Sequence, residues 1–117
     1  MKPDKLQDQR LLGVWCSDKT QTLEEWIFSP GTPFESRAKF SALLGKLKIR
    51  YTPARIFTEF ESDTTVCPYR VTAIDDDSVA IVRRTGGKNE IQHIHFLSEN
   101  TYWITCGRNR EFFVRMP

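Results

Sequence analysis

Short segments in which apolar and polar residues alternate make up much of the chain. Between Lys46 and Thr52, apolar side chains at positions 47, 49 and 51 alternate with basic ones at 48 and 50, and Arg55–Glu61 repeats the pattern. A period of two residues is typical of a β-strand that buries one face. We therefore predict strands at 46–52 and 55–61, separated by Pro53.

The same alternation predicts strands along most of the remaining chain. They are expected at 11–17, 64–74, 79–84, 90–97, 101–106 and 111–116. Pro68 lies within the second of these and should mark a bulge or an edge, because proline has no N–H to donate to a neighbouring strand. Short turns rich in Gly, Asn, Asp and Ser separate the segments, as they do in an antiparallel meander.

Residues 22–44 fit more than one pattern. We predict a strand at 22–28 and a returning strand at 34–40, joined by a type II turn at Pro30 and Gly31. A helix over 35–44 is the alternative to the second strand, since Phe40, Leu43 and Leu44 also fit one helical face, and Gly45 would end either element.

About ten short strands without a long helix predict an all-β fold. An antiparallel meander hides its edges best when it closes, so we expect an up-and-down barrel of about 8–10 strands, with a sandwich as the alternative. A chain of 117 residues is long enough for one such domain, 1–117. Residues 1–10 would form a lead-in, in which Asp4 caps a short helical turn and Leu6 points inward.

The cleanest strands indicate which side chains face the interior: Leu47, Ile49, Tyr51, Ile56, Phe60, Tyr69, Val71, Ile94 and Phe96. Several inward positions also carry polar atoms, namely Tyr51, Thr58, Cys67, Tyr69 and Gln92. These atoms either bond to one another or line a cavity that holds a ligand. The candidate lining residues are Tyr51, Phe60, Tyr69, Gln92, Phe96 and Trp103, although apolar residues on both sides of Trp103 leave its face open.

Charge and composition exclude some classes of function. The net charge is +2, and the 17 Lys and Arg residues are scattered, so a nucleic-acid partner is not expected. Lys46, Lys48 and Arg50 share one strand face, which we interpret as solvated. No segment is long and apolar enough for a signal peptide or a membrane span, which favours a cytoplasmic protein. Cys16, Cys67 and Cys106 lack the close spacing of a zinc site and should behave as small buried side chains.

Few residues suggest catalysis. No Gly-x-Ser-x-Gly turn is present, and no Cys or Ser has a recognisable base, so we expect no enzymatic activity and no cofactor. His93 and His95 share one strand face, but it is opposite to Ile94 and Phe96. We interpret the two as a solvent-facing pair; a metal site, completed by a ligand from a neighbouring strand, is the alternative.

Two short motifs support a resemblance to a known superfamily. Leu12-Gly13-Val14-Trp15 near the start and Phe113-Val114-Arg115 near the end resemble the lipocalin-like, or calycin, proteins. The resemblance implies that Trp15 lies at the closed end of the barrel, that Arg115 stacks across it, and that Gly13, Trp15 and Arg115 are structural. The chain lacks the disulfide and the acidic-turn motif of the longer secreted lipocalins and is more similar to short bacterial lipocalin-like domains.

The resemblance also implies a function. Lipocalin-like barrels hold a small, mostly apolar ligand in the lumen, so we expect non-enzymatic binding of a small hydrophobic or amphipathic molecule. The alternative is a filled barrel that acts through its surface, as a protein-interaction module or a homodimer built on an exposed strand.

Overall fold

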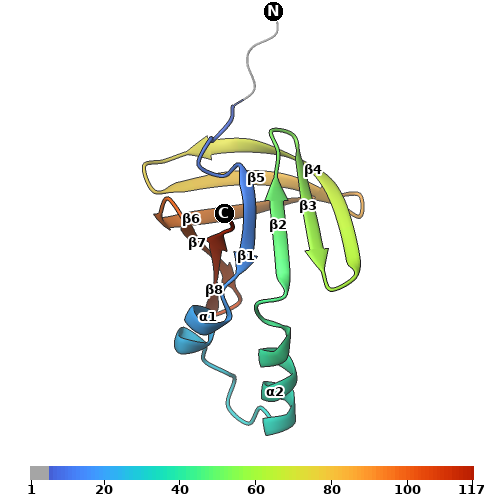
Figure 1. Cartoon of the computed structure of the whole chain (residues 1–117), viewed down its shortest axis with the longest axis vertical. Helices are drawn as coiled ribbons and strands as arrows, with labels where there is room; N and C mark the ends of the chain where they lie inside the picture. Colours follow the sequence, from blue (N-terminus) through green and yellow to red (C-terminus); the bar gives the residue numbers. More distant parts are fainter. Residues whose placement is uncertain (1–5) are drawn as a thin grey trace, which may run out of the picture.

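Eight antiparallel strands close into a barrel in the computed structural model, which describes residues 6–117 (Figure 1). The strands are β1 (Gly13–Ser17), β2 (Leu47–Tyr51), β3 (Arg55–Phe60), β4 (Asp63–Ile74), β5 (Ser78–Thr85), β6 (Lys88–Ser98), β7 (Thr101–Cys106) and β8 (Asn109–Arg115). Each strand pairs with the next in sequence, and β8 pairs with β1. The predicted all-β, up-and-down barrel is confirmed, with the lower of the expected strand numbers.

The barrel closes where the first and last strands meet. Trp15 of β1 lies opposite Arg115 of β8, and the guanidinium carbon lies 4.3 Å from the centre of the buried indole. Gly13 has a φ of +120°, and a Cβ there would come within 2.9 Å of Arg115 Nη1. A glycine is therefore required for both its backbone angle and the space it leaves to the arginine.

The prediction of a strand at 22–28 is wrong, because Lys19–Glu25 forms helix α1. The Asp18 side chain caps this helix by accepting a hydrogen bond from the backbone N–H of Gln21. Thr22 is fully buried, and its hydroxyl oxygen accepts a hydrogen bond from the N–H of Phe112 in β8. Capping and docking against β8 thus outweigh the β-propensity of the segment.

The strand predicted at 34–40 is also wrong; the helical alternative holds, as helix α2 (Phe34–Leu43). Pro33 immediately precedes the helix, and Gly45, with a φ of +85°, follows its end. No residue of α2 is buried, so its alternating pattern does not reflect a face packed on a sheet. Phe40 instead packs on Trp26, with ring centres 4.6 Å apart, and both helices project from one end of the barrel (Figure 1).

The lead-in differs from its prediction as well. Asp4 lies outside the described residues, and Leu6 is 49% exposed, so the inward position predicted for Leu6 is wrong. Leu11 is buried at the closed end instead, and its carbonyl accepts a hydrogen bond from the Trp15 indole. Arg10 fixes this segment to the β4–β5 turn by donating to the carbonyls of Asp75, Asp76 and Ser78.

Register irregularities bend the longer strands. β4 runs through Pro68, and its register shifts between Val71 and Ala73, so the bulge lies beyond the proline. A second shift separates Phe96 from Ser98 in β6.

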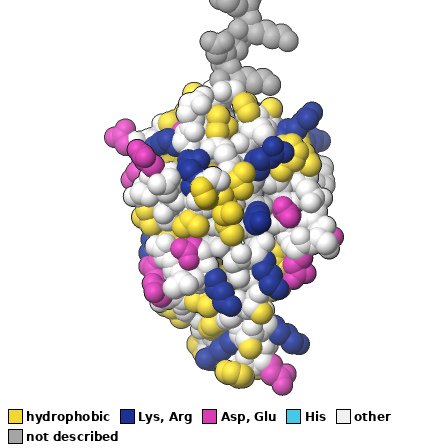
Figure 2. Space-filling view, in the orientation of Figure 1, with side chains coloured by type: hydrophobic (Ala, Val, Ile, Leu, Met, Phe, Trp, Pro, Cys, Tyr) yellow, Lys and Arg dark blue, Asp and Glu magenta, His cyan; other side chains and the backbone are white. Residues whose placement is uncertain are grey.

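Among residues 6–117, no helix has the length and apolar character needed to cross a membrane. On the face shown in Figure 2, basic side chains extend from the barrel to the helical end without merging into one patch.

Candidate functional site

The closed half of the lumen is filled by side chains. Because neighbouring strands run in opposite directions, the start of β1 and the end of β8 lie at the same barrel end as the end of β2 and the start of β7. Twelve buried residues form one cluster that reaches from this end to mid-barrel: Leu11, Trp15, Ile49, Tyr51, Ile56, Tyr69, Val71, Val79, Ile81, Ile94, Tyr102 and Phe113. An eight-stranded barrel is narrow enough for side chains to fill it in this way.

A pair of tyrosine hydroxyls lies within this cluster. The Tyr51 and Tyr102 hydroxyl oxygens are 3.0 Å apart and share a hydrogen bond. Burial raises the pKa of Tyr51 to about 12 and also raises the pKa of Tyr102 well above its usual value, while the nearby charge of Arg83 opposes both shifts. Both phenols are therefore neutral at physiological pH and satisfy each other as donor and acceptor.

The opposite half of the lumen is more open. The inward positions near the ends of β3, β5 and β7, and near the starts of the even-numbered strands, are only partly buried. They are Leu47, Thr58, Phe60, Cys67, Arg83, Gln92, Ile104, Cys106 and Glu111. Burial raises the pKa of Glu111, although a hydrogen bond from the Ser17 hydroxyl, 2.9 Å from the carboxylate, acts against the shift. The layer thus combines apolar surface with polar groups of both charges.

The barrel wall has a gap beside this layer. β6 and β7 pair only at His95, Phe96 and Ser98 of β6, so the preceding part of β6 has no partner on that side among residues 6–117. A pocket of about 200 Å³ lies at the gap, lined in part by the inward side chains of Arg83, Gln92 and Ile104. The pocket therefore lies at the part of the wall where β6 is not paired with β7 and includes inward side chains of the partly buried layer.

The six candidate lining residues fall into three environments. Tyr51 and Tyr69 belong to the buried cluster, where the Tyr69 hydroxyl donates to the Thr52 carbonyl at 2.6 Å. Phe60 and Gln92 lie in the partly buried layer.

The remaining two lie away from that layer. Phe96 is near the closed end, beneath the guanidinium of Arg10, whose carbon is 4.7 Å from the ring centre. Trp103 is on the face of β7 opposite Tyr102, where His95 stacks on it with ring centres 4.0 Å apart.

The two histidines differ in their surroundings. His93 is exposed, whereas His95 is partly buried against Trp103. Within the described residues, no three His, Cys, Asp or Glu side chains are grouped closely enough to hold a metal ion. The three cysteines are free and partly buried, and the pKa of Cys106 is raised by burial and by the nearby carboxylate of Glu111.

Sequence reasoning missed several residues of the site. Arg83 and Glu111 were not selected because each follows or precedes residues whose alternation is blurred: 79–82 is uniformly apolar, and 111–114 contains two adjacent phenylalanines. Tyr102 was missed because either face of 101–106 fitted an apolar interior. No signal in the sequence separates Arg83 from Arg84, because 79–82 is apolar throughout and the two arginines are adjacent.

Comparisons with known proteins returned no relative: no family model, curated protein or solved structure matches the chain.

Proposed function

We propose that the protein binds a small hydrophobic or amphipathic molecule in the open half of its barrel and has no catalytic activity. One observation carries the proposal: the pocket at the unpaired part of β6 is lined by Arg83, Gln92 and Ile104, which belong to the partly buried layer of the lumen. A barrel whose interior were filled from end to end would bury this layer as completely as it buries the closed half.

The residues of the layer suit such a ligand. Leu47, Phe60 and Ile104 offer apolar surface, while the amide of Gln92 and the ion pair of Arg83 with Glu90 can orient a polar end. The pocket volume of about 200 Å³ limits the ligand to a small molecule or to one end of a longer one. The lipocalin-like assignment is part of the proposal and is supported by the Gly-x-Trp motif and the stacking of Arg115 on Trp15.

A neutral apolar dye tests the proposal. We expect N-phenylnaphthylamine to bind the native protein with increased fluorescence, and Gln92→Trp to weaken binding about tenfold or more by filling the opening. Val66→Trp is the matched control, because Val66 is on the outer face of β4 and is 54% exposed. Absence of dye binding by the parent, or equal affinity in the parent and Gln92→Trp, would overturn the proposal.

The second candidate function is self-association through the same edge of β6. Residues 88–93 of this strand pair with β5 on one side only, and Ile91 is 69% exposed beside the free edge. Such an edge can add a strand from a second copy of the chain. Sedimentation velocity would then show a dimer that Ile91→Lys converts to a monomer; a parent protein that stays monomeric at high concentration rules this candidate out.

A further inference from the structure

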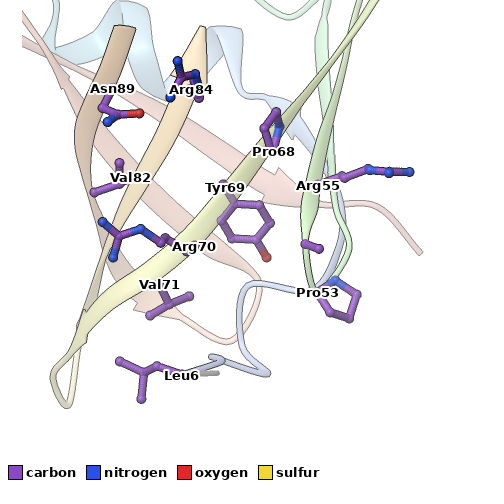
Figure 3. Close-up of a pocket in the computed structure, with 11 residues that line it drawn as sticks. Leu6, Pro53, Arg55, Pro68, Tyr69, Arg70, Val71, Val82, Arg84 and Asn89 are labelled. Atoms are coloured by element: carbon purple, nitrogen blue, oxygen red, sulfur yellow. The ribbon is translucent and has the colours of Figure 1, made fainter. Parts of the chain in front are cut away.

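A separate groove on the outside of the barrel combines a basic rim with an apolar floor (Figure 3). It has a volume of about 620 Å³, within the range of small-molecule sites. The lining comes from the lead-in, the β2–β3 turn and strands β3 to β6: Leu6, Pro53, Ala54, Arg55, Pro68, Tyr69, Arg70, Val71, Val82, Arg84 and Asn89. Three of these residues are arginines, and none is acidic.

Strand register brings the basic residues together. Arg70 lies opposite Val82, and Arg84 lies opposite Asn89, so residues of three consecutive strands share one outward face. Arg70 and Arg84 are diagonal neighbours across the β4–β5 pair, about 7–8 Å apart at the backbone, which is within reach of one group bound between two long side chains. Figure 3 shows Arg70 and Arg84 on the same side of the groove as Val82 and Asn89, whereas Arg55 extends away on the other side.

The two guanidinium groups are available for a ligand. Among residues 6–117, neither Arg70 nor Arg84 forms an ion pair or donates a side-chain hydrogen bond to the protein. By contrast, Arg83, which precedes Arg84 and faces the interior, forms an ion pair with Glu90, whose Oε2 is 3.6 Å from Arg83 Nε. Two unpaired arginines on one face repel each other unless an anion or solvent screens them, so an anion bound between them gains from both charges.

The floor of the groove is apolar. Figure 3 shows the Tyr69 ring near the centre, with Pro68 and Pro53 to one side and Val71 between the ring and Leu6. Tyr69 and Val71 belong to the buried cluster and are each 8% exposed, and the Tyr69 hydroxyl donates to the carbonyl of Thr52. Pro68 and Val82 therefore supply the outward apolar surface of the groove. This part of the groove favours an aliphatic or aromatic body over a purely ionic ligand.

We propose that the groove binds a small amphipathic anion whose carboxylate, sulfonate or phosphate group lies between Arg70 and Arg84 and whose apolar body covers Pro68 and Val82 on the same outward face. The fork of donors in each guanidinium matches the oxygens of such a group, and the amide of Asn89 supplies a further donor. The site is on the outer face of β4 and β5 and does not depend on whether the lumen holds a ligand.

Fluorescence titration with anilinonaphthalene sulfonate, which joins an anionic group to an aromatic body, tests the proposal. Arg70→Gln/Arg84→Gln should weaken dye binding about tenfold or more, because it removes two charge-assisted contacts. Asn89→Asp, which places a carboxylate opposite Arg84 at little change in size, should weaken it in the same direction. Lys39→Gln/Lys48→Gln removes the same charge at two exposed positions outside the groove and should leave the affinity unchanged.

Displacement of the bound dye separates the chemical requirements. Decanoate and decyl phosphate should displace it from the parent protein. Decanol, which has the apolar chain but no anionic group, and inorganic phosphate, which has the charge but no chain, should not. Circular dichroism of every variant establishes that the native fold is retained. Equal dye affinity in the parent and the double arginine variant, or an equal loss in the lysine control, would overturn the proposal. Because the lumen test uses a neutral dye and Gln92→Trp, failure of one proposal leaves the other standing.

Discussion

Replacing Arg115 by methionine measures how strongly its guanidinium holds the barrel closed. The group donates hydrogen bonds to the carbonyls of Arg10, Leu12 and Glu99 and lies over the ring of Trp15. A hydrogen bond to a charged group contributes about 1.5–3 kcal/mol when buried, and roughly 0.5–1 kcal/mol for each of the three is reasonable here because the carbonyls are partly exposed. With about 0.5–1 kcal/mol for the cation–π contact, the expected loss of unfolding free energy is about 2–4 kcal/mol.

Urea unfolding followed by tryptophan fluorescence and far-ultraviolet circular dichroism gives the measurement. At a slope of about 2 kcal/mol per M, the midpoint should fall by about 1–2 M. Arg50→Met is the control, since Arg50 lies 4.2 Å over the Phe57 ring but donates no side-chain hydrogen bond within the described residues. It should cost about 0.5 kcal/mol or less. If both variants shift the midpoint equally, the carbonyl contacts of Arg115 do not hold the strands together.

Two further predictions concern buried polar groups. Tyr51→Phe or Tyr102→Phe should each cost about 1–3 kcal/mol by leaving the other hydroxyl unpaired, and the double variant should cost less than the sum of the two. Burial raises the pKa of Tyr51 from 10.0 to about 12, so between these pH values the folded state keeps a proton that the unfolded state loses. The free energy of unfolding should therefore fall as the pH rises through this window, and it should fall less in the double variant. Equal losses of the two proteins at alkaline pH in urea titrations would contradict this. Burial also raises the pKa of Glu111 above 4.5, so its contribution to stability falls as pH rises through the raised value, and Glu111→Gln should be more stable than the parent at neutral pH but not below pH 4.5. Equal urea midpoints at neutral pH would show that the carboxylate is not destabilising there.

The strands were predictable because their alternation reflects real burial. Ile49, Tyr51 and Ile56 are buried, whereas Lys48 and Arg50 are exposed, so the pattern read from the sequence is the pattern of the barrel wall. The two helices were not the preferred prediction from the sequence, for two different reasons. α1 carries a capping signal, Asp18 followed by Gln21, that was available in the sequence and was outweighed by the β-prone residues after it. α2 buries no side chain, so its helical periodicity, indicated only by Phe40, Leu43 and Leu44, was too weak to be preferred over the alternating pattern.

The candidate sites depend on register more than on composition. Arg70 and Arg84 are separated by a turn and most of two strands, and only the β4–β5 register places them on one outward face. Likewise, the unpaired part of β6 follows from the short pairing of β6 with β7, which the length of the two predicted strands does not reveal. Long-range pairing of this kind is fixed by packing across the whole sheet and leaves little signal in any single segment.

In a barrel this small, both proposed ligand sites lie where the packing of the interior ends. Trp15, Tyr102 and Phe113 stack within the closed half, with Tyr102 centred 4.6 Å from Trp15 and 4.9 Å from Phe113, and no room is left between them for a guest. Binding capacity must therefore come from interruptions of the regular wall. The pairing of β6 with β7 ends early, and the register of β4 shifts after Val71, which lies at the groove that Arg70 and Arg84 line. Both candidate sites thus follow from irregular pairing in a sheet whose interior is otherwise filled.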